Sequence, residues 1–274
     1  MTREGATASR RASWFGAALF WAVQLTLLLG FGVPLLDTVL VAALAVAVPA
    51  LALAQVPLID EAEVERMPAY WGSIVTLWFL GSLTWLVGAR DGGGAALGVI
   101  AIHPGALAVW TVGLVVAAFA IILVFREIAT RSSAPDTPLL RQLLPRTPRE
   151  RGVFALLSLA AGVGEELAYR GYFITVVAPA LGTVGAAVVS SIAFGLVHAY
   201  QGPLGMLRTS LMGGLLAWGF LASGSILPAM VAHVLIDILA GIVLGERLLS
   251  PECPGGVDTD PLPRRPADDA PPWK

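Results

Sequence analysis

Long apolar runs limit this chain to one class of fold. A helix that crosses the hydrocarbon core of a bilayer needs about 20 mostly apolar residues, and runs of this kind recur as far as residue 246. Charged residues make up 13% of the sequence, whereas a soluble domain has about 25%. We therefore expect an all-α, polytopic transmembrane bundle of about eight helices. The expected helices lie near residues 14–36, 38–58, 70–89, 104–125, 151–178, 183–200, 204–223 and 226–246.

The first apolar run resembles a secretory signal only superficially. Arg3, Arg10 and Arg11 precede it, but residues 14–36 form a longer run than the roughly 7–15 apolar residues of a cleavable signal. A further apolar run follows almost at once. We interpret residues 14–36 as an uncleaved first helix.

Basic residues predict the orientation. Residues 126–151 form the densest basic stretch, and the N-terminal segment is also basic. Four expected helices separate the two, so both lie on one side, which the positive-inside rule assigns to the cytoplasm. Residues 60–65 are acidic and would be cytoplasmic too, but acidic residues count little in this rule. We expect a multi-pass protein of the cell inner (plasma) membrane with both termini cytoplasmic.

The chain divides into four expected parts. Residues 1–13 are a cytoplasmic tail, residues 14–149 hold the N-terminal transmembrane helices and loops, and residues 150–247 form a second transmembrane core. Residues 248–274 are rich in Pro, Gly and Asp without an apolar period, which predicts disorder. The single cysteine excludes an intrachain disulfide. The net charge of −2 gives no indication of nucleic acid as a partner.

Ionisable residues inside the apolar helices are concentrated in the second half of the chain. They are Glu165, Glu166 and Arg170 in the fifth expected helix, His198 in the sixth, and His233 and Asp237 in the eighth. A charge at the bilayer centre costs about 2.5–3.5 kcal/mol on insertion scales and marks a functional site by default. A spare carboxylate and two imidazoles from three helices are the groups that activation of water in an apolar site requires.

Spacing within each helix suggests individual roles. Glu166 and Arg170 are four residues apart and can pair along one face, and we favour a structural ion pair over a catalytic one. Glu165 is rotated by about 100° from Glu166, so we expect it to point in another direction and serve another role. His233 and Asp237 are also four residues apart, which lets the carboxylate orient the imidazole. Alternatively, an intramembrane histidine is a hydrogen-bond donor between helices.

Three motifs in order carry a family resemblance. Residues 165–170, EELAYR, fit EExxxR; residues 194–198, FGLVH, fit FxxxH; and residues 233–237, HVLID, fit HxxxN/D. Together they resemble the CPBP family, named for CAAX proteases and bacteriocin-processing enzymes, which includes the Ras-converting CAAX endopeptidases. The resemblance covers residues 150–246. It implies an intramembrane endopeptidase, a hydrolase that cuts a membrane-associated protein or peptide.

The resemblance also implies roles for the motif residues. Glu165 would be the general base that activates water, and His198 would help to hold that water. His233 and Asp237 would stabilise the oxyanion of the tetrahedral intermediate. CAAX members often have Asn at the position of Asp237, and a carboxylate donates a hydrogen bond only when protonated. Asp237 is therefore neutral, orients His233 or binds a metal.

Three residues are expected to support this site, and a metal is an open alternative. Glu166 and Arg170 would brace the helix that carries the base, and Phe194 precedes His198 by one helical turn. A divalent metal such as zinc takes two His and one carboxylate with water in the fourth position. The candidate ligands are Glu165, His198 and His233. The family is described both as a metalloprotease family and as glutamate-based, and the chain contains no HExxH.

Two other functions remain alternatives to the endopeptidase. Intramembrane Glu, His and Arg residues also mark proton relays, as in a proton-coupled transporter, although no inverted repeat is visible. In a non-catalytic scaffold or immunity-type protein, the same cluster would only hold helices together.

Overall fold

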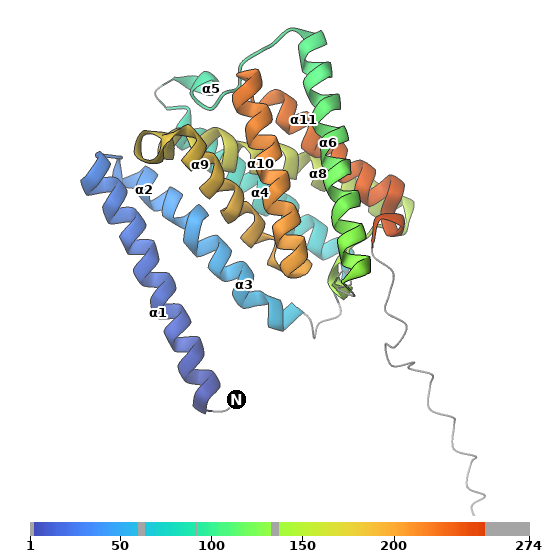
Figure 1. The fold of residues 1–274 in the computed structure, drawn as a ribbon, viewed down its shortest axis with the longest axis horizontal. Coiled ribbons are helices and arrows are strands. Elements are labelled where there is room, and N and C mark those ends of the chain that lie inside the picture. The colour runs from blue at the N-terminus through green and yellow to red at the C-terminus, as the bar shows by residue number, and fades with distance from the viewer. Residues whose placement is uncertain (1–2, 60–63, 91, 133–136, 250–274) are drawn as a thin grey trace, which may run out of the picture.

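The computed structural model describes residues 3–59, 64–90, 92–132 and 137–249. The expected disordered tail, residues 248–274, lies outside the described residues apart from its first two. All regular structure in these ranges is helical and forms one bundle (Figure 1). The N-terminal elements are α1 (Arg3–Leu25), η1 (Thr26–Gly30), α2 (Leu35–Ala42), η2 (Ala43–Ala47), α3 (Val48–Ile59), α4 (Arg66–Gly88), α5 (Gly93–Ala96), α6 (Pro104–Arg131) and α7 (Pro138–Gln142).

The remaining elements form the part of the bundle that carries the three motifs. They are α8 (Pro148–Glu165), η3 (Glu166–Ile174), α9 (Thr175–Val197), η4 (Ala199–Gln201), α10 (Gly202–Ser223), α11 (Leu227–Ile238), η5 (Leu239–Leu244) and η6 (Gly245–Leu248). η1, η2, η3 and η5 have π-helical hydrogen bonding, whereas η4 and η6 are 3₁₀ turns.

Six helices among the described residues are long and apolar enough to cross a membrane. They are Leu35–Val56, Arg66–Gly88, Pro104–Arg131, Pro148–Val197, Ala199–Ser223 and Leu227–Leu244. The expected polytopic helical bundle is confirmed, but the count of eight is not. The first expected helix, near residues 14–36, contains only the shorter apolar helix Trp14–Gly30. The two helices expected near 151–178 and 183–200 fall together in Pro148–Val197.

The long segment Pro148–Val197 doubles back on itself. Its 50 residues would reach about 75 Å as a single helix, more than twice the thickness of the hydrocarbon core. Gly182 interrupts it with φ 71° and ψ 160°, a backbone conformation that glycine adopts readily. The Ser190 hydroxyl then donates to the carbonyl of Tyr169 across 2.6 Å. The chain after Gly182 therefore returns alongside η3.

The start of α8 is fixed by its sequence. The Thr147 side chain accepts from the backbone N–H of Glu150, and the Glu150 carboxylate accepts from the N–H of Thr147, which forms a capping box. Pro148 occupies the first helical position, where its missing N–H costs nothing. These contacts set where the helix begins, and Glu165 is its last residue.

Small residues let α8 pack closely against α4. A Cβ added to Gly164 would lie 2.4 Å from the carbonyl oxygen of Leu77, and one added to Gly81 would lie 2.9 Å from the Cα of Gly164. Only glycine allows the two backbones to approach this closely. Gly164 immediately precedes Glu165. The contact therefore fixes the position and rotation of α8 at Glu165.

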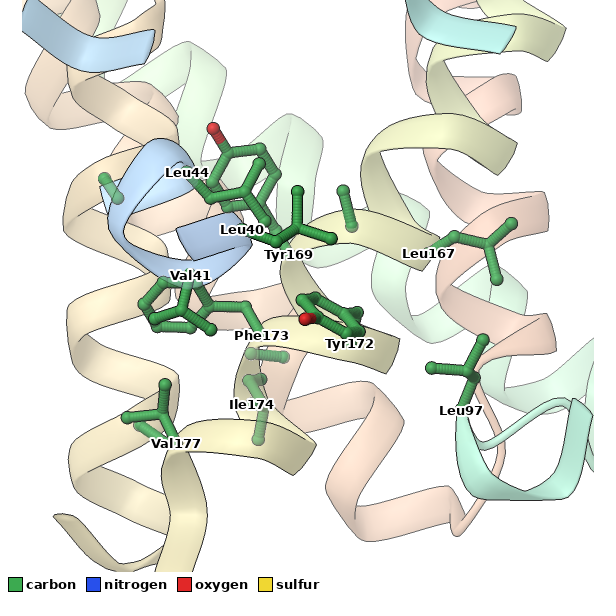
Figure 2. Close-up of a cluster of buried hydrophobic side chains, with 14 of the residues drawn as sticks. Leu40, Val41, Leu44, Leu97, Leu167, Tyr169, Tyr172, Phe173, Ile174 and Val177 are labelled. Atoms are coloured by element: carbon green, nitrogen blue, oxygen red, sulfur yellow. The ribbon is translucent and has the colours of Figure 1, made fainter. Parts of the chain in front are cut away.

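η3 lies at the centre of the largest buried apolar cluster. All nine of its residues are buried, and its side chains pack against residues of α2, η2 and α9 (Figure 2). Leu40, Val41 and Leu44 from the N-terminal helices lie beside Tyr169 and Phe173 in this view. The N-terminal half of the chain therefore packs directly on the segment that follows Glu165.

Candidate active site

Glu165 and Glu166 lie where an α-helix becomes a π-helix. Glu165 is the last residue of α8, and Glu166 is the first of η3. π-helical turns have less regular hydrogen bonding than α-helices and occur frequently at functional sites. The Glu166 side chain is 0% exposed and the Glu165 side chain 13% exposed. Two adjacent carboxylates are thus held inside the bundle, where an unpaired charge is strongly unfavourable.

Glu166 joins Arg170 and His233 in a buried relay. Arg170 Nη1 donates to Glu166 Oε1 at 3.0 Å, and His233 Nδ1 lies 2.8 Å from the same oxygen. Because an ionised carboxylate only accepts, His233 carries its proton on Nδ1 and donates it to Glu166. The ion pair expected from the four-residue spacing is present. It also fixes the orientation of the imidazole from a helix 67 residues further along the chain.

The other imidazole nitrogen faces two further carboxylates. His233 Nε2 lies 3.6 Å from Glu165 Oε2 and 3.7 Å from Asp237 Oδ2. Both distances exceed the 2.7–3.2 Å of an N–H···O hydrogen bond, so Nε2 is committed to neither oxygen. Glu165 was expected to point in another direction from Glu166. Instead, the two carboxylates approach opposite nitrogens of one ring, because the ring lies across the junction between α8 and η3.

Phe194 packs against Arg170, His198 and His233. The Arg170 guanidinium carbon lies 4.2 Å from the centroid of the Phe194 ring, a cation–π contact. The rings of His198 and His233 lie 4.8 and 6.2 Å from the same centroid. Gly213 of α10 makes room for this arrangement, since a Cβ there would lie 3.1 Å from Arg170 Nη2. Phe194 therefore holds both histidines and the arginine in register.

His198 follows the last residue of α9 and packs against the ring of Phe194. Its Nδ1 lies 2.8 Å from the backbone carbonyl of Phe194. Because a carbonyl only accepts, Nδ1 carries the proton, and in the neutral ring Nε2 is left as an acceptor. Among the described residues, no hydrogen bond or ion pair links His198 directly to Glu165 or His233. The structure therefore brings Glu165, Glu166, Arg170, His233 and Asp237 together, and both His198 and His233 pack against Phe194.

The donor set does not fit a resident metal ion. Glu165, His198 and His233 were the candidate ligands. Across the ranges that the structure describes, no group of three or more His, Cys, Asp or Glu side chains could hold a metal ion. His198 bonds the backbone carbonyl of Phe194 through Nδ1, which leaves Nε2 as its only possible ligand atom. Within those ranges, the side chains as they lie thus form no ready ligand set for zinc or another divalent cation.

The sequence did not predict the contact between Glu166 and His233. Spacing within one helix gives the pair Glu166 and Arg170, but the third partner comes from α11 and depends on how α8 packs against that helix. Gly162 gives a partial signal, because a Cβ there would lie 2.4 Å from Val234 Cγ2 and so marks the crossing point of α8 and α11. A small residue one turn before a buried acidic pair indicates a close helix contact, although it does not identify the partner.

Comparison with protein families gives one match to this region. Residues 148–239 match the family described as type II CAAX prenyl endopeptidase Rce1-like. The matched segment begins at the first residue of α8 and ends at the first residue of η5, so it contains all of the clustered side chains. Comparison with curated proteins gives no match, and comparison with solved structures gives none.

The match suggests a CAAX-type protease, a hydrolase that lies in the membrane. The three sequence motifs and the family match concern the same helices and the same residues. The resemblance predicted from the motifs is therefore confirmed: residues 148–239 match the Rce1-like family of CAAX endopeptidases.

Proposed function

We propose that this protein is an intramembrane endopeptidase that hydrolyses a peptide bond in a membrane-associated protein or peptide. The observation that carries the proposal is the position of His233. Its Nδ1 is bonded to Glu166, while its Nε2 faces Glu165 and Asp237 without being committed to either. Hydrolysis of an acyl group by water needs a general base and a polar group near the carbonyl oxygen. Glu165 can supply the base, and the oriented His233 ring can supply its Nε2 as the polar group.

Glu165 acts as the general base. Its carboxylate takes a proton from a water molecule, and the oxygen of that water attacks the carbonyl carbon of the substrate. His198 Nε2, left as an acceptor by the bond from Nδ1 to Phe194, accepts the second proton of the same water in a hydrogen bond. General acid–base catalysis of this kind contributes about 10²–10⁴-fold to the rate.

His233 stabilises the charge that develops on the carbonyl oxygen. Its Nδ1 donates to Glu166, so a second proton on Nε2 makes the ring an imidazolium whose Nε2–H can donate to the oxyanion. The surrounding carboxylates of Glu165, Glu166 and Asp237 favour that charged form. Asp237 then acts by supporting the imidazolium rather than by donating to the oxyanion, which accounts for a carboxylate where CAAX members often have Asn.

The reaction closes when Glu165 returns the proton. The tetrahedral intermediate collapses, the C–N bond breaks, and the protonated Glu165 gives its proton to the leaving amine. The first products are a carboxylic acid and an amine. The acid then gives its proton to the amine, which leaves a carboxylate and an ammonium group, and the site returns to its starting state. Glu166, Arg170 and Phe194 take no part in bond making and hold the imidazole and the guanidinium in place.

We further propose that the protein lies in the cell inner (plasma) membrane with both termini in the cytoplasm. The basic stretch of residues 126–151 and the basic N-terminal segment support this orientation. The start of α1 and the end of α6 also lie at the same end of the bundle (Figure 1). We keep the division of the chain into residues 1–13, 14–149, 150–247 and 248–274, with residues 150–247 as the catalytic core.

Cleavage by the purified protein tests the proposal. Wild type in mild detergent is given a library of lipid-modified and unmodified peptides, and new termini are identified by mass spectrometry. We expect Glu165→Gln to lower the rate by at least about 10²-fold, since it removes the base but keeps the shape. Glu127→Gln is the matched control, because Glu127 is an exposed glutamate on α6.

Three results would contradict the proposal in different ways. Equal rates for wild type and Glu165→Gln would show that Glu165 is not the base. Proton flux in vesicles that depends on Glu165, without any cleavage, would favour a transporter. A loss of thermal stability in the Glu165, Glu166 and His233 variants, again without any cleavage by wild type, would favour a scaffold.

A further inference from the structure

A second ionic cluster is centred on a buried carboxylate that lies outside the segment that matches the family. Asp37, in the first turn of α2, is 2% exposed. Tyr172 of η3 donates its hydroxyl to Asp37 Oδ1 at 2.8 Å, and Arg90 Nη1 donates to the same oxygen at 3.1 Å. Arg90 Nη2 also pairs with Asp37 Oδ2. Three segments that are far apart in the sequence thus meet at one carboxylate.

Tyr172 is fixed on its other sides as well. It is 0% exposed, and a Cβ added to Gly88 at the end of α4 would lie 2.9 Å from its ring carbon Cδ2. Leu97 packs beside it in the same buried cluster (Figure 2). The ring has no space to move, so the hydroxyl fixes the position of η3 relative to α2 and α4.

The position of η3 matters because this segment begins directly after the candidate base. Glu166 is its first residue, Arg170 lies in its middle, and Tyr172 follows two residues later. A π-helix is rarer than an α-helix and needs support from its surroundings. Asp37 is buried, and a buried carboxylate is unfavourable unless it is paired, which Arg90 and Tyr172 provide. The contacts of Asp37 therefore indicate that it supports η3.

We propose that Asp37, Arg90 and Tyr172 are positioning residues for the active site. They hold η3 so that Glu165 and Glu166 face the two nitrogens of His233. Through Asp37 and Arg90, the N-terminal half of the chain thus affects the geometry of the active site. This inference rests on the proposed function. It differs from a purely structural role in one respect, namely that the cluster affects the chemical step more than it affects folding.

Steady-state kinetics on Tyr172→Phe and Asp37→Asn test the inference. Each variant keeps the shape of the side chain and removes one partner of the cluster. We expect kcat to fall by about 10–100-fold, since a displacement of about 1 Å of a catalytic group can cost 10²-fold, while KM changes by less than about twofold. Asp37→Glu keeps the charge and is expected to restore part of the lost kcat.

Tyr70→Phe is the matched control. Tyr70 of α4 is 1% exposed and its hydroxyl donates to the carbonyl of Leu143 at 2.6 Å, away from η3. This variant loses a buried tyrosine hydrogen bond of the same kind, so it is expected to lower thermal stability as much as Tyr172→Phe does. Its kcat is expected to stay within about twofold of wild type.

The outcomes separate this inference from the proposed function. If Glu165→Gln abolishes cleavage while Tyr172→Phe and Asp37→Asn keep the wild-type kcat, the positioning role is wrong and the endopeptidase stands. Equal losses of kcat in Tyr172→Phe and Tyr70→Phe would also overturn it, because they would reflect stability alone. A wild-type protein that cleaves nothing would overturn both. If Asp37→Asn does not fold, Tyr172→Phe decides, since it leaves the ion pair intact.

Discussion

Two ion pairs in this molecule have the same spacing and opposite surroundings. Glu166 and Arg170 of η3 are 0% and 1% exposed, whereas Glu127 and Arg131 of α6 are 60% and 78% exposed. Both are four residues apart, with N···O distances of 3.0 and 2.7 Å. Spacing and distance alone therefore do not distinguish a functional pair from a surface pair.

The difference lies in what else the carboxylate contacts. Glu166 Oε1 accepts from Arg170 and from His233, so the buried pair is part of a three-residue relay. The Glu127 carboxylate accepts from Arg131, one turn further along the same exposed face. A buried pair requires both partners, because the loss of one leaves an uncompensated charge, whereas an exposed pair is solvated either way.

The largest expected effect is on stability. Arg170→Met leaves Glu166 buried without its cation and removes the cation–π contact with Phe194. We expect the free energy of unfolding to fall by about 3–5 kcal/mol. Arg131→Met on the surface should lower it by less than about 1 kcal/mol. Denaturant unfolding in mild detergent measures both, and equal losses would contradict the comparison.

The next effect is on catalysis. Glu166→Gln keeps an acceptor for His233 Nδ1 but removes the charge that supports an imidazolium. We expect kcat to fall by about 10²-fold, within the range of general acid–base effects. Glu127→Gln should leave kcat unchanged. Steady-state rates on a cleaved peptide provide the measurement, and a Glu166→Gln rate within twofold of wild type would show that the charge of Glu166 does not support the imidazolium.

A smaller effect is expected at the edge of the site. Asp237 is 35% exposed and lies beyond hydrogen-bond distance of His233 Nε2. Asp237→Asn keeps the shape of the side chain and removes a charge that lies beyond hydrogen-bond distance of His233, so we expect the rate to stay within about 10-fold of wild type. A loss of more than about 10²-fold in the same assay would show that the carboxylate itself is required.

The smallest effect is expected from salt. The Debye length falls from about 10 Å at 0.1 M to about 3 Å at 1 M, which screens exposed charges and hardly affects buried ones. A double-mutant cycle on Glu127 and Arg131 should therefore lose most of its coupling energy at high salt. The same cycle on Glu166 and Arg170 should keep its coupling energy. Equal salt sensitivity of the two cycles would show that water reaches the buried pair.

The helical fold was predictable from local patterns, and so was the region in which the ionisable side chains gather. Apolar length alone indicated membrane helices, and three motifs selected Glu165, His198 and His233 for one region. The count of eight helices was not confirmed, because apolar length does not show where one helical run ends. Pro148–Val197 counts as one candidate span although its backbone turns at Gly182, and the first apolar helix, Trp14–Gly30, is short.

The contacts between helices were not predictable. The bond from His233 to Glu166 joins residues 67 positions apart, and that from Tyr172 to Asp37 joins residues 135 apart. Both depend on the rotation of η3, whose π-helical turns shift side chains away from the 100° steps that we applied to Glu165. Asp37 lies between the first two expected helices, which gave no reason to connect it with the site.

The most direct test of the central claim is a single turnover in H₂¹⁸O. Enzyme in excess over a cleaved peptide is mixed in labelled water, and mass spectrometry measures the new carboxyl terminus. If Glu165 activates water, each product molecule carries one ¹⁸O atom at that terminus. An unlabelled terminus would show that a carboxylate of the protein attacked the peptide and gave up its own oxygen, and it would contradict the account.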